Sequence, residues 1–270
     1  MILSNEKRQF EEQGYLIYRG LFSPQEAQSY LDHFMILRAQ GSKPGDFTGV
    51  DVTSTDPLKK YPRMIHMHRW DSLSLDWMLD PRIAEALTDL LDEEPFGVQT
   101  MIYYKPPTAR GQALHQDQYY LRVQPGTCIA AWMALDPCDE ENGCLHVVPG
   151  SQNWPLLCTV KADTTRSFTD VTVPIPYGTP VHAMVMQPGD VLFFNGQVVH
   201  GSGPNTTSDR FRRSLIGHYV AGDAQEIAKW FHPALRMDGS VVTLGTSEGG
   251  GTCGVWVDQE GTPVIELAEQ

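Results

Sequence analysis

Histidine and aspartate residues in the middle of the chain could together hold a metal ion. Of the nine histidines, only His115 stands in a His-x-Asp triplet, with Asp117 two positions later. Side chains two positions apart on a β-strand point to one face, so an extended segment from 114 to 119 would bring the imidazole and the carboxylate together. A histidine–carboxylate hydrogen bond without metal explains such a triplet equally well.

His200 is the candidate for a third ligand. It follows the apolar run DVLFFN and a tight turn, and Gly201 and Gly203 permit close backbone approach. A second histidine beside a His-x-Asp triplet gives the two-histidine, one-carboxylate set of non-haem Fe(II) oxygenases, which leaves coordination positions open. The simpler alternative is that His200 is a surface turn residue.

The arginine-rich stretch 210–213 (RFRR) precedes the β-type run SLIGHYV. An arginine that enters a barrel on a strand is costly unless it pairs with an anion, and its planar fork suits a carboxylate. A solvated basic strand end is the competing interpretation. On an unbroken strand, His218 would share a face with Arg212.

A histidine pair, His66 and His68, lies within a short basic stretch at 59–69. The pair could bind a metal of another kind, but it has no carboxylate in register. We therefore favour a pocket-lining or surface role, and we assign both histidines to substrate binding as a prediction. The basic stretch could face an anionic substrate or cosubstrate at the opening of the site.

The predicted secondary structure that positions these residues changes from helical to β-type near Pro95. Before it, a capping box at Ser23 and the pair Asp80-Pro81 open amphipathic helices. After it, short β-type runs alternate with turn residues, which favours an antiparallel barrel or jelly roll over βαβ units. The sequence predicts one mainly-β domain over 1–270, with a helical scaffold at about 1–95, a jelly-roll core at about 96–220 and a C-terminal extension at about 221–270.

Composition narrows the possible partners. The formal net charge of −13 argues against nucleic acid or an anionic membrane surface as the main partner. The apolar runs are too short for a membrane span, and we recognise no signal-peptide pattern or peroxisomal address. Five cysteines without a CxxC motif predict reduced thiols and a cytoplasmic protein. The oligomeric state is left open.

Several blocks, taken in order, resemble the phytanoyl-CoA dioxygenase family of Fe(II)/2-oxoglutarate-dependent oxygenases. The matching blocks are FEEQGYLIYRGLFSPQEA (10–27), MIYYKPP (101–107), LHQD (114–117), AAW (130–132), NGCLHVVPGS (142–151), PGDVLFF (188–194), and HGSGPN (200–205) leading to FRRSLIGHY (211–219). Their order and spacing are far more specific than any single triplet. The resemblance implies a double-stranded β-helix of the cupin-like, jelly-roll type.

The resemblance also implies roles for individual residues. The iron ligands would be His115, Asp117 and His200. Arg212 would hold the distal carboxylate of 2-oxoglutarate, although the segment after His200 is one residue longer than in much of the family, so Arg210 or Arg213 could take that place. Other implied cosubstrate contacts are Ser202, Trp132 and Met101. Gln116 would support the site from behind, and an aspartate ligand favours hydroxylation over halogenation.

The expected reaction is hydroxylation of a small organic substrate, with 2-oxoglutarate and O2 converted to succinate and CO2. One alternative is a cupin-like, O2-dependent metalloenzyme that uses no 2-oxo acid. Another is a non-catalytic sensor of 2-oxoglutarate or metal. The acidic composition gives no support for recognition of coenzyme A, for which the 59–69 stretch is the only candidate. We therefore do not assign phytanoyl-CoA, the substrate that gives the family its name, to this protein.

Overall fold

Helices dominate the N-terminal part of the chain. The computed structural model describes residues 2–249 and 252–269. The predicted capping box is confirmed, because the Ser23 hydroxyl accepts from the Glu26 amide and the Glu26 carboxylate accepts from the Ser23 amide. None of the described helices is both long and apolar enough to cross a membrane. The helices are α1 (Ser4–Gln13), α2 (Pro24–Ala39), α3 (Pro57–Lys60), α4 (Ser72–Met78), α5 (Pro81–Leu91) and α6 (Gln118–Leu121).

Two antiparallel sheets form the jelly roll. The larger has eight strands in the order β1-β10-β5-β12-β3-β14-β15, with β2 paired to β3, and the smaller has the order β4-β11-β6-β9. The strands of the larger sheet are β1 (Tyr15–Tyr18), β2 (Met64–Ile65), β3 (Pro95–Lys105), β5 (Cys128–Ala134), β10 (Val191–Asn195), β12 (Arg212–Ala221), β14 (Ala234–Leu235) and β15 (Val241–Val242). Those of the smaller sheet are β4 (Gln112–His115), β6 (Leu145–Val147), β9 (His182–Ala183) and β11 (His200–Ser202).

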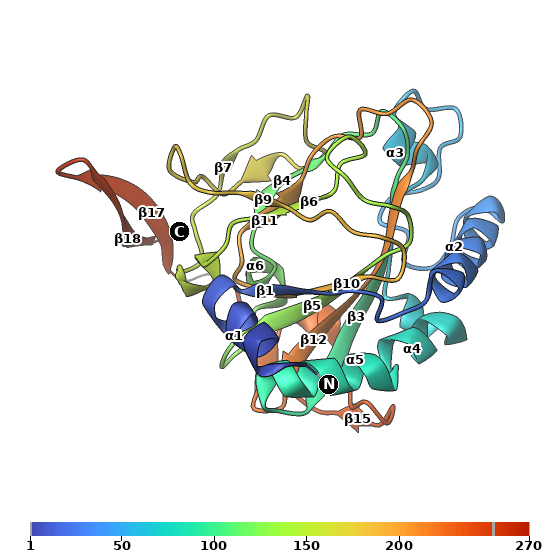
Figure 1. The fold of residues 1–270 in the computed structure, drawn as a ribbon, viewed down its shortest axis with the longest axis horizontal. Helices are drawn as coiled ribbons and strands as arrows, with labels where there is room; N and C mark the ends of the chain where they lie inside the picture. Colours follow the sequence, from blue (N-terminus) through green and yellow to red (C-terminus); the bar gives the residue numbers. More distant parts are fainter. Residues whose placement is uncertain (1, 250–251, 270) are drawn as a thin grey trace.

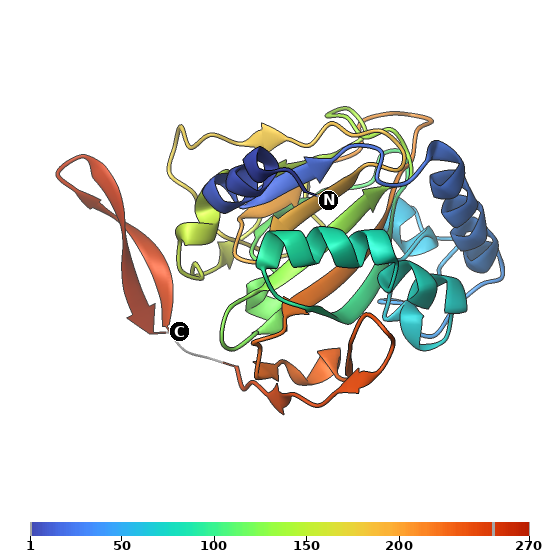
Figure 2. The same ribbon diagram turned by 60° about the horizontal axis from the view of Figure 1, so that its bottom comes forward.

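The larger sheet is buried on both faces. Along β5, Ile129, Ala131 and Met133 pack into the apolar layer shared with the helices. Ala130, Trp132 and Ala134 point to the opposite face and pack into the layer shared with the smaller sheet. Figures 1 and 2 show α5 lying across β3, β5 and β12. The helices therefore cover one face, and the space for a site lies between the two sheets.

The C-terminal part ends in a hairpin. Figures 1 and 2 show it projecting from the body of the molecule. A disulfide joins Cys158 to Cys253 at its base, and Trp256 donates to the Pro174 carbonyl. The expectation of reduced thiols is therefore wrong for this pair, whose partners lie 95 residues apart. The additional short strands are β7 (Val160–Lys161), β8 (Val171–Thr172), β13 (Glu226–Ile227) and β16 (Gly245–Thr246), and the hairpin is β17 (Thr252–Gln259) and β18 (Thr262–Glu269).

Candidate active site

Three side chains from separate positions meet between the sheets. His115 ends β4 and His200 begins β11, and strand pairing places these two residues directly opposite each other. The Nε2 atom of His115 lies 3.4 Å from Asp117 Oδ1, and that of His200 lies 3.6 Å from Asp117 Oδ2. One potential ligand atom from each residue falls within 4.8 Å of the others. This close grouping is the geometry that the sequence predicted.

The local backbone differs from the expectation. The segment 114–119 is not extended, since β4 ends at His115 and Asp117 adopts helical dihedrals before α6. The turn is held from behind by Gln116, whose amide donates to the Pro155 and Gln197 carbonyls and whose oxygen accepts from the Leu157 amide. His115 and Asp117 therefore converge through a strand-to-helix turn, while Gln116 faces away.

Hydrogen bonds to the backbone fix the tautomers of both histidines. The Nδ1 atom of His115 lies 3.0 Å from the Ala113 carbonyl, and that of His200 lies 3.0 Å from the Val198 carbonyl. A carbonyl can only accept, so Nδ1 donates in both rings, and Nε2 is the atom that faces Asp117. Burial, and next the neighbouring His115, lowers the pKa of His200 to about 4. The imidazole is therefore neutral and ready to act as a ligand at neutral pH.

The carboxylate of Asp117 is held by a third imidazole, that of His218. The Nε2 atom of His218 lies 3.1 Å from Asp117 Oδ2, and because a carboxylate only accepts, this nitrogen donates. Burial raises the pKa of Asp117, and the hydrogen bond from His218 lowers it. His218 shares the cavity-facing side of β12 with Arg212, as its strand parity predicted.

This donor set matches ferrous iron. Two neutral imidazole nitrogens and one carboxylate oxygen form the two-histidine, one-carboxylate combination that leaves positions for other ligands. Each ligand is oriented by a hydrogen bond from outside the set, which is usual for metal sites. The side-chain Nε2 atom of Gln112 lies 3.0 Å from His115 Nε2, which is the atom that would face a metal. Sequence reasoning missed this residue because no motif includes it.

Two buried cations lie near the candidate ligands. Arg212 on β12 pairs in register with Lys105 on β3, and both donate to the Gly143 carbonyl. Lys105 Nζ also donates to the Ser202 hydroxyl at 2.8 Å. Burial, and next the charge of Arg212, holds the pKa of Lys105 well below its usual value. Within the described chain, neither cation forms an ion pair with a carboxylate, so this corner of the site is poised to accept an anion.

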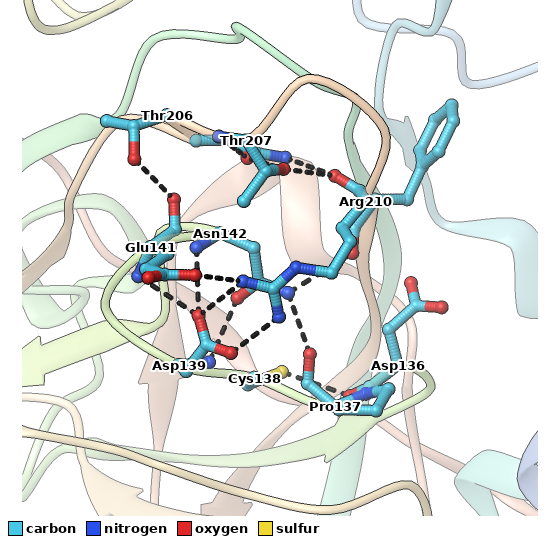
Figure 3. Close-up of polar contacts among 11 residues, drawn as sticks. Asp136, Pro137, Cys138, Asp139, Glu141, Asn142, Thr206, Thr207 and Arg210 are labelled. Atoms are coloured by element: carbon cyan, nitrogen blue, oxygen red, sulfur yellow. Dashed lines mark hydrogen bonds and ion pairs between the residues drawn. The ribbon is translucent and has the colours of Figure 1, made fainter.

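The other two arginines of the RFRR stretch are already occupied. Arg213 forms a bidentate ion pair with Asp136. Figure 3 shows Arg210 reaching Asp139 and Glu141, at 2.6 and 2.8 Å. Of the three candidates, only Arg212 combines deep burial with the lack of a carboxylate partner among the residues described.

A cavity of about 540 Å³ opens onto the three candidate ligands. Met101 and Trp132 line it, and the guanidinium of Arg212 lies 5.3 Å from the centroid of the Trp132 ring. Ser202 lies at the end of β11, where its hydroxyl accepts hydrogen bonds from Lys105 Nζ and from the backbone N–H of Gln112. Of the four predicted cosubstrate residues, Met101 and Trp132 line the cavity directly, whereas Arg212 contacts Trp132 and Ser202 lies two residues after the candidate ligand His200.

His66 and His68 lie behind the cavity wall. The Nδ1 atom of His68 is 3.0 Å from the Thr100 hydroxyl, and the His66 ring packs on Phe231, which lines the cavity. Burial, and next Arg69, lowers the pKa of His66 to about 3 and that of His68 to about 4. A direct substrate contact by either histidine stays a prediction. The residue of the basic stretch that does line the cavity is Arg63.

Comparison with known proteins identifies relatives of this site and fold. A sequence model of the phytanoyl-CoA dioxygenase family matches residues 10–214. The peroxisomal phytanoyl-CoA dioxygenase of Rattus norvegicus is 28% identical over 242 residues, which cover 84% of this chain and 71% of the relative. A probable phytanoyl-CoA dioxygenase of Caenorhabditis elegans is also 28% identical over 242 residues, covering 82% and 77% of the two chains.

Solved structures share the fold. The epimerase SnoN in complex with Fe3+, alpha ketoglutarate and nogalamycin RO superposes with a TM-score of 0.67 at 20% identity, covering 82% of this chain and 84% of SnoN. EvdO2 from Micromonospora carbonacea var. aurantiaca gives a TM-score of 0.66 at 23% identity, covering 82% and 91% of the two chains. These likenesses confirm the jelly-roll architecture.

Proposed function

The chain belongs to the phytanoyl-CoA dioxygenase family of Fe(II)/2-oxoglutarate-dependent oxygenases, and we propose that its cavity hydroxylates a small organic substrate. The observation that carries the proposal is the pairing of two unlike features in one site. A two-histidine, one-carboxylate set faces the cavity. Behind Trp132, which lines the same cavity, lies the buried cation Arg212, paired in register with Lys105; neither has a carboxylate partner in the described chain. A metal and a dianionic cosubstrate would complete both features.

His115, Asp117 and His200 are the residues that would hold iron. Bound there, Fe(II) supplies the activation of O2 that couples decarboxylation of 2-oxoglutarate to oxidation of a C–H bond. The chain's own part is orientation. The Ala113 and Val198 carbonyls keep the histidine lone pairs inward, and His218 fixes one carboxylate oxygen of Asp117.

Arg212 is the proposed partner of the distal carboxylate of 2-oxoglutarate. Arg212 is 3% exposed, so a carboxylate bound there would form a desolvated, charge-assisted contact. The Ser202 hydroxyl already accepts two hydrogen bonds, from Lys105 and Gln112, and its own proton is left to donate to the same carboxylate. Trp132 and Met101 would pack against the carbon chain of the cosubstrate and exclude water.

The two alternative functions, a cupin-like enzyme without a 2-oxo acid and a non-catalytic sensor, differ in whether they need Arg212 and Lys105. A cupin-like enzyme without a 2-oxo acid has no use for two unpaired buried cations, which are costly to maintain. A non-catalytic sensor would use them but would release no succinate. We carry both alternatives only as outcomes of the test below.

Succinate release tests the proposal directly. The protein is incubated with Fe(II), ascorbate and 2-oxoglutarate without a prime substrate, and succinate is quantified against an Asp117→Ala variant. We expect uncoupled succinate above the level of that variant. Tight binding of 2-oxoglutarate without succinate would favour the sensor, and no binding at all would favour the enzyme without a 2-oxo acid.

We also propose one dioxygenase domain for the whole chain, and a cytoplasmic location. The location rests on three buried free thiols, Cys128, Cys138 and Cys144. The Cys158–Cys253 disulfide is more typical of an oxidising compartment. Fractionation of the source cells tests the location: recovery of the protein in the cytoplasmic fraction supports the proposal, and recovery from an oxidising compartment contradicts it.

A further inference from the structure

A cation without a carboxylate partner stands on the cavity wall, on a different element from Arg212. Arg63 directly precedes β2 and lines the cavity together with the candidate metal ligands. Its guanidinium lies 3.9 Å from the centroid of the Phe47 ring, 5.4 Å from that of Tyr103 and 5.7 Å from that of Phe168. Aromatic rings thus surround the cation and hold its plane in place.

The hydrogen-bonding capacity of Arg63 is largely unused. Its side chain donates to the Tyr103 hydroxyl, whereas a guanidinium has five N–H donors. Asp170 also lines the cavity, but no ion pair joins it to Arg63. By contrast, Arg38 and Arg213 each have a carboxylate within 2.7 Å. Within the described chain, Arg63 is therefore a half-buried cation with donors to spare, facing a cavity.

The tyrosine beside Arg63 links it to the metal site. The Tyr103 hydroxyl donates to Gln112 Oε1 at 3.2 Å, and the Gln112 amide stands 3.0 Å from His115 Nε2. Two consecutive hydrogen bonds thus join Arg63 through Tyr103 to Gln112, whose side chain lies beside the candidate ligand His115. A group bound to Arg63 would therefore lie in the same cavity as this ligand.

Apolar surface continues outward from the same point. A smaller pocket of about 200 Å³ shares Phe47, Arg63, Tyr103 and Phe168 with the cavity. Phe47 is 59% exposed, although it stands at the rim of a buried site. Exposed aromatic rings around a cavity provide contact area for an apolar ligand.

We infer that Arg63 binds a carboxylate of the prime substrate, and that the apolar body of this organic acid packs against the rings of Phe47 and Phe168. One cation with a planar fork matches one singly charged carboxylate. This inference rests on the proposed function, because it treats the cavity as the substrate site. Arg63 is thus a specificity-determining residue, separate from the cosubstrate contact assigned to Arg212.

Paired ligands test the inference without knowledge of the natural substrate. The protein is loaded with Mn(II) and saturating 2-oxoglutarate, and the dissociation constants of 3-phenylpropionate and 3-phenylpropionamide are measured by calorimetry. We expect the acid to bind the wild type roughly tenfold more tightly than the neutral amide, the factor that about 1.4 kcal/mol represents. In Arg63→Gln the preference should vanish, and in Arg63→Lys part of it should remain.

The controls separate this inference from the proposed function. Arg8→Gln removes a cation of the same type from an exposed helix position and should leave the preference unchanged. The affinity of the Mn(II)-loaded protein for 2-oxoglutarate is measured in every variant. Equal binding of acid and amide to the wild type overturns the inference, as does an Arg63→Gln variant that weakens 2-oxoglutarate and not the acid. Failure of the wild type to bind 2-oxoglutarate contradicts the proposed function instead.

Discussion

Arg212 and Lys105 lie opposite each other on paired strands and donate to one carbonyl oxygen, that of Gly143. Their positive charges are adjacent, buried and without a carboxylate partner in the described chain. Such an arrangement is unfavourable for the empty protein, because each charge loses hydration and repels the other. An anion bound by Arg212 would offset this cost, whereas Lys105 already donates to three acceptors within the protein, Gly143, Ser202 and Gly203.

Replacement of the arginine should therefore act on the cosubstrate alone. In Arg212→Ala we expect the dissociation constant for 2-oxoglutarate to rise roughly 100-fold, because a charge-assisted contact in a buried site contributes about 1.5–3 kcal/mol. Affinity for Mn(II), measured by electron paramagnetic resonance, should stay within a factor of about two. Arg210→Ala, which breaks only the pairs with Asp139 and Glu141, is the matched control. An unchanged 2-oxoglutarate affinity in Arg212→Ala would move the role to Arg210 or Arg213.

The contact between His218 and Asp117 predicts a second effect, on the metal alone. Loss of a hydrogen bond that orients a ligand usually lowers metal affinity about 10- to 100-fold. We expect this loss for Mn(II) in His218→Phe, whereas His218→Gln keeps a donor and should retain most of the affinity. Circular dichroism and melting temperature establish that both variants are folded. Equal affinities in the two variants would show that the hydrogen bond to Asp117 has no part in metal binding.

The buried histidines predict a dependence of stability on pH. Burial lowers the pKa of His66 from its ordinary value near 6.5 to about 3. Between these pH values the imidazole is protonated in the unfolded chain and neutral in the folded chain. The free energy of unfolding should therefore fall as the pH drops from about 6.5 to about 3, by at most about 1.4 kcal/mol per pH unit for this group. His66→Asn, which tolerates the positive φ of 55° at this position, should reduce the slope. Urea unfolding of the two proteins across this pH range measures the difference, and equal slopes would contradict the assignment.

The disulfide at the base of the C-terminal hairpin predicts an effect of reductant. A crosslink between residues 95 positions apart typically stabilises the folded state by about 2–4 kcal/mol. Dithiothreitol should therefore lower the free energy of unfolding of the wild type and speed amide exchange in 252–269. The Cys158→Ser/Cys253→Ser variant should already be at the lower value and should not respond to reductant. A wild type that is insensitive to reductant would argue that the bond contributes nothing to stability.

Local patterns in the sequence were sufficient for the fold class and for the identity of the candidate ligands. The alternation of short β-type runs and turns predicted an antiparallel barrel or jelly roll, because period-two burial and turn chemistry are local properties, and the family resemblance implied the jelly roll. The order of motifs around His115, Asp117 and His200 predicted which residues meet, although the triplet meets through a turn and not along a strand. The capping box at Ser23 and the outward orientation of Gln116 were predicted in the same way.

The partners of charged groups were decided only by the tertiary structure. Arg210, Arg212 and Arg213 are indistinguishable along the chain, and only the folded loops show that two of them meet carboxylates while Arg212 does not. The same holds for the unpaired Arg63 in its aromatic surroundings, for the bond between Cys158 and Cys253, and for the contact of His218 with Asp117. These relationships join residues 16 to 101 positions apart. Sequence patterns record the periodicity of an element, whereas pairing across elements depends on how the elements pack.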